Sequence, residues 1–308
     1  MKYNTFFFGS SRVYRQINPE RFDAILSQDS LFLSSFNMGA PGVFAPQSFY
    51  LYENFLNSAV SNKAKYCFLE LTRFSRIGEG IEHQERSNYW VTWQEYLRIC
   101  RWLYNNKTRS RGNQAKLLLG YTIGLFERQF HIGHFREQMN DLNYYNPHYL
   151  GPQKDGHLSL EDDIRTTTNK EYKEGLIEKH QNLIDNPEEL TERSRKSVSE
   201  RSLINSAQVD QIYLQRIQNL LSQSERKGIY LTFILSPRHS YKELFKVASL
   251  IPSEHLLDLN NSKQYPELYL MENSEDAGHL NNQGAKIYTE KLAKEFITKL
   301  KHNGMNSR

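Results

Sequence analysis

Three residues near the two ends of the chain could together perform nucleophilic catalysis. Ser11 follows Gly9 and Ser10 close to the N-terminus, and Asp276 and His279 lie three residues apart near the C-terminus. A serine hydroxyl is a weak nucleophile that needs an adjacent base. His279 could take its proton, while Asp276 orients the imidazole and stabilises its charged form. The alternative is a helix-capping serine and an unrelated surface Asp–His pair.

The sequence before Ser11 predicts how this hydroxyl is presented. The apolar run Phe6-Phe7-Phe8 indicates a buried strand, and Gly9 allows a tight turn directly after it. Ligands of parallel α/β sheets bind beyond the carboxyl ends of the strands. We therefore expect Ser11 at such an end, near the start of a segment whose unpaired N–H groups can stabilise an anion.

Apolar runs alternate with helical periodicity over the two end portions of the chain. Strands are predicted at 6–8, 31–36, 65–72, 228–235 and 256–259, and residues 116–121 are either a strand or the end of a helix. Helices are predicted at 47–60, 93–104, 209–221, 241–250 and 286–300. Strands that alternate with helices predict a parallel sheet in a three-layer α/β/α domain.

The middle of the chain has a different character. Residues 126–227 are rich in charged and amide side chains and poor in long apolar runs. We predict that 1–125 and 228–308 form the α/β domain, and that 126–227 is a helical insertion or cap over one end of the sheet. A partly mobile loop region is the alternative.

Composition limits the classes of function. The 308 residues are enough for one large or two modest domains. A net charge of +4, with basic and acidic residues interspersed and no long basic run, gives no indication of nucleic-acid binding. Cys67 and Cys100 are too few for a disulfide framework. No apolar run approaches the ~20 residues that span a bilayer. We expect any export or anchor segment to lie outside this chain.

Other motifs are weaker. His131-Ile132-Gly133-His134 matches the HIGH signature of class I aminoacyl-tRNA synthetases, but no KMSKS sequence accompanies it, so we interpret it as chance. These two histidines lack a third ligand at a recognised spacing, and no metal site is predicted. Phosphate-binding loops, GxGxxG, HExxH, CxxC pairs and the GxSxG elbow are absent from the sequence.

The two ends of the chain together resemble the SGNH/GDSL hydrolase superfamily. Gly9-Ser10-Ser11 occupies the place of the family's Gly-Asp-Ser, and Asp276-Ala277-Gly278-His279 matches its Asp-x-x-His. The resemblance covers about residues 3–73 and 229–297. It implies a flavodoxin-like sheet, a Ser-His-Asp esterase or acyltransferase site and no cofactor.

The resemblance also implies an oxyanion hole. The family uses the N–H of its serine and of a glycine after the second strand, which here is Gly42, with Gly39 as a competitor and a plain turn as the alternative. The family's third block supplies an Asn donor, but this chain has Phe74 at the aligned position. The candidates to replace that donor, or to bind substrate, are Arg12, Asn37, Arg73 and Arg238.

Residues after the predicted strand 228–235 could reach the same cleft. Arg238 and His239 are expected either to bind an anionic or hydroxyl-rich substrate, or to be a solvated arginine and a capping histidine.

The expected function is therefore an esterase or O-acyltransferase with an acylated glycan, a cell-envelope polymer or another ester as substrate, in the cell envelope. Two alternatives stay open. One is a catalytically degenerate SGNH fold that binds a polymer without turnover. The other is an envelope-assembly protein that uses residues 126–227 as a partner surface.

Overall fold

Five parallel strands form one sheet in the order β2-β1-β3-β4-β5. The computed structural model describes residues 2–73, 87–105, 109–130 and 148–304. The strands are β1 (Thr5–Phe8), β2 (Ser35–Asn37), β3 (Tyr66–Glu70), β4 (Tyr230–Leu235) and β5 (Leu256–Asp258). This strand order is that of flavodoxin-like folds. The predicted three-layer α/β/α architecture with a parallel sheet is confirmed.

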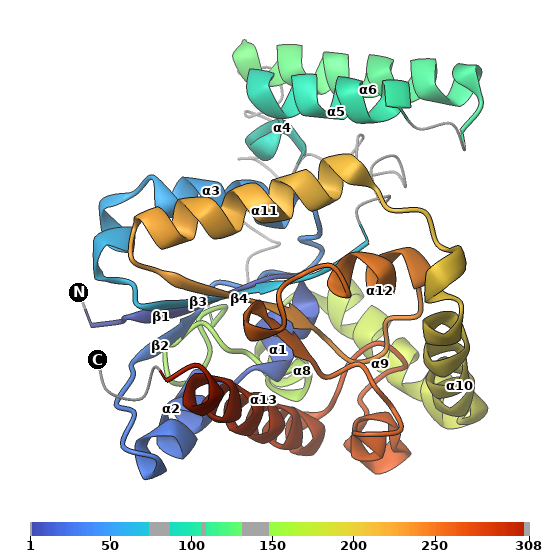
Figure 1. Cartoon of the computed structure of the whole chain (residues 1–308). Coiled ribbons are helices and arrows are strands. Elements are labelled where there is room, and N and C mark those ends of the chain that lie inside the picture. Colours follow the sequence, from blue (N-terminus) through green and yellow to red (C-terminus); the bar gives the residue numbers. More distant parts are fainter. Residues whose placement is uncertain (1, 74–86, 106–108, 131–147, 305–308) are drawn as a thin grey trace.

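Helices cover both faces of the sheet (Figure 1). The helices of the described residues are α1 (Ser11–Gln16), α2 (Pro19–Gln28), α3 (Gln47–Leu56), α4 (Ser87–Trp90), α5 (Trp93–Asn105), α6 (Arg111–Gln129), α8 (Leu160–Thr166), α9 (Lys170–Asp185), α10 (Glu188–Ser202), α11 (Gln211–Arg226), α12 (Lys242–Ala248) and α13 (Asn282–His302). Helices α3, α11 and α12 pack on one face, and α1, α2 and α13 pack on the other.

The strand sequences explain this burial on both faces. Side chains alternate between the two faces of a strand, so a strand covered on both sides is apolar throughout. Phe6 and Phe8 of β1 enter the core beneath α3 and α11, whereas Phe7 enters the opposite core, where it stacks on Phe68 of β3 at 4.7 Å between ring centroids. The continuous aromatic run that predicted the first strand therefore serves two cores.

Two predicted elements differ from those observed, and the open choice between strand and helix at residues 116–121 is decided. Residues 116–121 lie inside helix α6, because Leu117 and Tyr121 are buried while Leu118 and Leu119 between them are exposed, which is a helical period. The second strand is limited to Ser35–Asn37, the residues that pair with β1. The helix predicted at 47–60 ends at Leu56 and is followed by a 3-10 turn.

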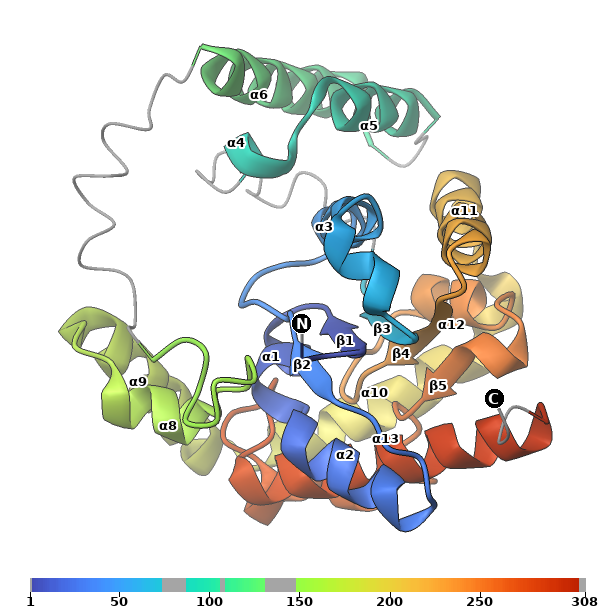
Figure 2. The same ribbon diagram turned by 90° about the vertical axis from the view of Figure 1, so that its left-hand side faces the viewer.

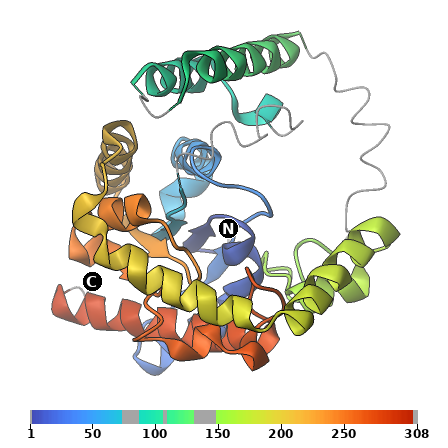
Figure 3. The same cartoon turned by 90° about the vertical axis from the view of Figure 1, so that its right-hand side faces the viewer.

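Most of the remaining described chain is helical. Helices α8 and α9 lie beside α1, as Figure 2 shows, and α10 runs along the molecule on the side seen in Figure 3. Helices α4, α5 and α6 stack outside the layer of α3 and α11 (Figure 1). Among the helices of the described residues, none combines the length and the apolar content needed to span a bilayer.

Candidate active site

Ser11 lies where the strand order of the sheet reverses. Strand β1 has β2 on one side and β3 on the other, and this switch point is where open α/β sheets bind ligands. Ser10 caps helix α1, since its hydroxyl accepts the N–H of Arg12, and Ser11 is the first helical residue. Both sequence alternatives therefore apply, to different residues: Ser10 is the capping serine, and Ser11 carries the half-buried hydroxyl at the strand end.

The structure brings Ser11, His279 and Asp276 into one hydrogen-bonded chain. The Ser11 hydroxyl lies 2.8 Å from Nε2 of His279. Nδ1 of the same imidazole lies 2.9 Å from Oδ2 and 3.0 Å from Oδ1 of Asp276. Residues from the two ends of the chain thus adopt the geometry of a nucleophile, a base and an orienting carboxylate.

The protonation states suit that geometry. Burial raises the pKa of Asp276, but the hydrogen bond and charge of His279 and the N–H groups of Gly278 and His279 outweigh burial and hold this pKa well below its ordinary value. An ionised Asp276 only accepts hydrogen bonds, so Nδ1 of His279 carries the proton and Nε2 offers its lone pair to Ser11. Burial, reinforced by the charges of Arg12 and Arg15, lowers the pKa of His279 despite Asp276. The imidazole is therefore a neutral base at neutral pH.

The loop that carries Asp276 and His279 is fixed from within. Oδ1 of Asp276 accepts the N–H of Gly278 at 2.6 Å and that of His279 at 2.7 Å. Ser274 and Leu280 form an antiparallel bridge across the base of the loop. This turn holds the carboxylate and the imidazole three residues apart in the chain and in direct contact.

Arg238 holds the same loop from below, which corrects its predicted role in substrate binding. Its guanidinium donates to the carbonyl oxygens of Asp276 at 2.9 Å and His279 at 3.0 Å, to Ser274 Oγ at 2.6 Å and to the carbonyl of Leu268. The residue is only 2 % exposed, with its backbone in the left-handed region at φ 66°. Arg238 is neither solvated nor free for substrate; it positions the Asp–His loop.

Asn37 is also a structural residue, contrary to its prediction as an oxyanion donor. Both of its amide hydrogens are used, because Nδ2 donates to the carbonyls of Val13 and Ile17 at 2.8 and 2.9 Å. Its Oδ1 accepts the N–H of Gly39 at 2.9 Å, so that N–H is occupied as well. A side chain on Gly39 would collide with the backbone of α1, 2.6 Å from the nitrogen of Tyr14.

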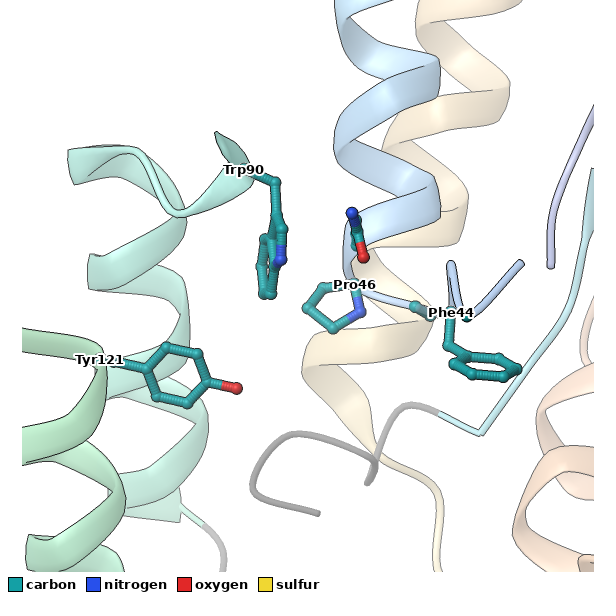
Figure 4. Close-up of a pocket in the computed structure, with 7 residues that line it drawn as sticks. Phe44, Pro46, Trp90 and Tyr121 are labelled. Carbon is teal, nitrogen blue, oxygen red and sulfur yellow. The ribbon is translucent and has the colours of Figure 1, made fainter. Parts of the chain in front are cut away.

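Gly42 therefore stays the candidate for the second oxyanion donor. It adopts φ 75°, a conformation that favours glycine. The loop in which it lies also lines a small pocket, shown in Figure 4. The other lining residues are Phe44, Ala45, Pro46, Gln47, Trp90 and Tyr121. Trp90 of α4 and Tyr121 of α6 face Pro46 there.

Glu70 is a site residue that the sequence analysis did not assign. It ends β3, is fully buried, and accepts the N–H of Ser10 at 2.7 Å; its Oε1 lies 3.6 Å from Nε2 of His239. Burial raises its pKa, but His239, the charge of Arg12 and the Ser10 N–H prevail and lower the pKa to about 2. His239 is 4 % exposed and faces this carboxylate, so neither substrate binding nor helix capping describes it. In the sequence, the feature that could have identified Glu70 is a carboxylate at the carboxyl end of an apolar strand.

Arg12 remains a candidate for contact with substrate. It is half-buried and follows Ser11 directly, and its charge acts on both Glu70 and His279. Its Nε has no hydrogen-bond partner within the described part of the chain. Arg73, another proposed replacement, lies over the ring of Tyr241 at 4.6 Å. Phe74 and His131–His134 lie outside the described residues.

The middle segment reaches the site through α1. Arg15, one helical turn after Ser11, donates to Oδ2 of Asp163 at 2.6 Å and to the hydroxyl of Tyr172 at 2.8 Å. His180 of α9 donates from Nδ1 to the carbonyl of Glu275, next to Asp276. Helices α8 and α9 thus contact the helix that begins at Ser11 and the loop that carries His279.

In comparisons with protein-family models, curated proteins and solved structures, no match to the chain is found. The functional assignment therefore rests on the geometry and chemistry of the site. Within the described ranges, no group of three or more His, Cys, Asp or Glu side chains could hold a metal ion.

Proposed function

We propose that this chain is a serine esterase or O-acyltransferase that works through an acyl-enzyme on Ser11. One observation carries the proposal: residues 268 positions apart in the sequence meet as Ser11, His279 and Asp276 at 2.8 and 2.9 Å. A buried carboxylate, a neutral imidazole and a half-buried serine hydroxyl, in that order, form the constellation that activates a serine.

The proposed reaction has two steps. Ser11 Oγ attacks the carbonyl carbon of an ester while Nε2 of His279 takes the hydroxyl proton. The bond from the carbonyl carbon to the leaving oxygen then breaks, and His279 returns the proton to the departing alcohol. In the second step, water or an acceptor hydroxyl gives its proton to His279 and attacks the acyl-Ser11 carbonyl. The bond from that carbon to Ser11 Oγ then breaks, His279 returns the proton to Oγ, and an acid or a new ester is released.

The developing oxyanion needs donors in fixed positions. We assign this role to the backbone N–H groups of Ser11 and Gly42. Arg12 adds a positive charge beside the reacting atoms, and in this proposal it compensates for the Asn of related enzymes. Asn37 and Arg238 are excluded from this role, since their donors are already bound.

The proposed substrate is an acylated glycan or cell-envelope polymer. This substrate class rests on the SGNH resemblance. It also allows either water or a hydroxyl group to accept the acyl group. Helices α8 and α9, which contact α1 and the Asp–His loop, would then contribute to the substrate cleft.

Ester turnover tests the proposal. We would measure product release from 4-nitrophenyl acetate and from O-acetylated glycans with the wild type, Ser11→Ala and the matched control Ser199→Ala, an exposed serine on α10. The expected result is that Ser11→Ala lowers kcat/KM by at least about a thousandfold and Ser199→Ala leaves it unchanged. Equal turnover by wild type and Ser11→Ala would contradict the proposal. Absence of turnover by folded wild type would favour the binding protein.

A further inference from the structure

The outer face of the α5–α6 hairpin is apolar and exposed. On α5, Trp93, Leu97 and Tyr104 are exposed and Cys100 between them is half-buried. On α6, the exposed apolar residues at matching intervals are Leu119, Ile123 and Phe126. Exposed Phe130 follows directly after the helix and continues its repeat, since its N–H bonds to the carbonyl of Phe126. Steps of four, three and four residues place each set on one side of its helix. We call these seven apolar residues with Cys100 the outer stripe.

The core does not need the outer stripe. The opposite sides of the same helices are already buried, through Ile99, Trp102 and Leu103 on α5 and Leu117, Tyr121 and Leu125 on α6. Polar contacts add to this attachment, because Arg216 of α11 bonds to Glu95 at 2.8 Å and the Trp102 indole donates to Asp210. Both helices are therefore apolar on two opposite sides, whereas a helix that packs on one side needs only one apolar side.

The two helices hold the outer stripe as one surface. The hydroxyls of Tyr96 on α5 and Thr122 on α6 are hydrogen-bonded at 2.8 Å. At the end of the hairpin, the rings of Phe126 and Phe130 are nearly parallel, 6.2 Å apart. Figures 1 and 2 show the hairpin at the edge of the molecule, outside α3 and α11.

The hairpin is also strongly basic. Residues 93–129 contain seven Lys and Arg but only two Glu, and one of these, Glu95, is already paired with arginines. Arg101, Arg111 and Lys116 are exposed. Their positions in the helical repeat place them on the flanks of the outer stripe. The surface is thus an apolar centre with a cationic border.

We propose that the outer stripe docks on the surface of an anionic lipid bilayer, with the hairpin lying in the headgroup region. Trp and Tyr favour this interface because one end of each ring system is apolar and the other polar. Long Lys and Arg side chains extend from an apolar surface to anionic headgroups. This docking is independent of the proposed esterase chemistry.

The charge favours a bilayer over a second copy of the chain. A symmetric dimer through the outer stripe would bring two basic hairpins together, and like charges across an interface are unfavourable. An anionic lipid surface neutralises the same residues and covers the apolar ones.

Vesicle flotation tests the proposal on the full chain. The vesicles would contain phosphatidylglycerol and phosphatidylcholine in equal amounts, or phosphatidylcholine alone. The variants are Leu97→Gln/Leu119→Gln/Phe130→Gln in the outer stripe, Arg101→Gln/Lys116→Gln on its flanks, and the control Phe32→Gln, an exposed aromatic between α2 and β2. All of these positions lie on the surface, so folding is preserved.

The expected result is binding to the anionic vesicles that falls at least about tenfold in the triple variant. The charge variant binds less tightly and with a weaker salt dependence, and Phe32→Gln binds as wild type. No binding of wild type, or equal binding of wild type and the triple variant, would overturn the proposal. A dimer in light scattering that the triple variant abolishes, without vesicle binding, would assign the outer stripe to a second copy instead.

Discussion

The backbone N–H of Ser10 donates a 2.7 Å hydrogen bond to Oε2 of Glu70, which ties the residue before the candidate nucleophile to the end of the neighbouring strand. Gly9 makes this approach possible, because a Cβ at that position would lie 2.6 Å from Cβ of Glu70 and 2.8 Å from its Oε2. Strand β3 thereby sets the turn from which Ser11 is presented. Glu70 acts through this turn, so we regard it as a positioning residue.

Replacing Glu70 with Gln should weaken both the fold and the rate. The pKa of Glu70 is about 2 in the folded protein and 4.5 in the unfolded chain, so its charge stabilises the fold above pH 4.5 and this stability is lost as the pH falls toward 2. Glu70→Gln should lower the free energy of unfolding at pH 7 by roughly 3 kcal/mol. Urea unfolding measures this.

The kinetic readout separates positioning from a purely structural role. A displaced Ser11 should reduce kcat by on the order of a hundredfold, while KM changes little. The control is Glu267→Gln, which removes a surface pair with Lys291 and should have little effect. Unchanged kcat in folded Glu70→Gln would mean that this carboxylate does not position the nucleophile.

Arg12 should set the acid limit of activity. The reaction needs neutral His279, whose pKa is lowered first by burial and further by the charges of Arg12 and Arg15. Removing the charge in Arg12→Gln raises that pKa, so the acid limb of kcat/KM moves to higher pH. Arg12→Lys keeps the charge and should leave the limb in place. A limb that does not move in the Gln variant would show that Arg12 has no electrostatic effect on the base.

The buried ion pair of Arg15 and Asp163 should be the main tie between α1 and α8. Asp163→Asn leaves the guanidinium buried and without its counter-charge, which should destabilise the protein by about 3–5 kcal/mol. The matched control Glu189→Gln breaks the exposed pair with Arg193 and should cost less than about 1 kcal/mol. Chemical unfolding compares the two. Similar small losses in both variants would argue against the tie.

His157 should make stability depend on pH in mildly acidic solution. It is buried and donates from Nε2 to the carbonyl of Arg15 at 3.1 Å, and burial lowers its pKa to about 4 from an ordinary 6.5. Its contribution is complete above pH 6.5 and is lost as the pH falls through 4. Between pH 7.5 and 4.5, wild type should lose roughly 2–3 kcal/mol more than His157→Gln. Parallel losses in both proteins would contradict this assignment.

The sequence predicted the layers of the fold and the contact between Asp276 and His279 because both depend on local patterns. Phe6 to Phe8 is an apolar run long enough for a strand buried on both faces, and Asp276 and His279 are close in sequence, so their contact needs only a turn. The contact with Ser11 then follows from the topology, since Ser11 begins α1 directly after β1 and the Asp–His loop precedes α13, the helix packed beside α1.

The errors concern polar residues whose partners are distant in sequence. In the sequence, an arginine that binds substrate cannot be distinguished from one that donates to four acceptors within the protein. Only the folded chain shows that Arg238 binds the carbonyls of Asp276 and His279. Asn37 likewise donates both of its amide hydrogens to backbone carbonyls of α1 and its C-cap.

The apolar run at residues 116–121 fitted a strand as well as a helix. Burial of Leu117 and Tyr121 against the rest of the protein favours the helix.

The most direct test of the central claim is labelling with a fluorophosphonate probe, mapped by peptide mass spectrometry. The 2.8 Å contact of Ser11 with His279 predicts covalent modification of Ser11 in wild type. The label should be absent in Ser11→Ala and strongly reduced in His279→Ala, with Ser199 unlabelled throughout. A folded wild-type protein in which Ser11 stays unmodified, or a label that persists without His279, would contradict an activated serine at this site.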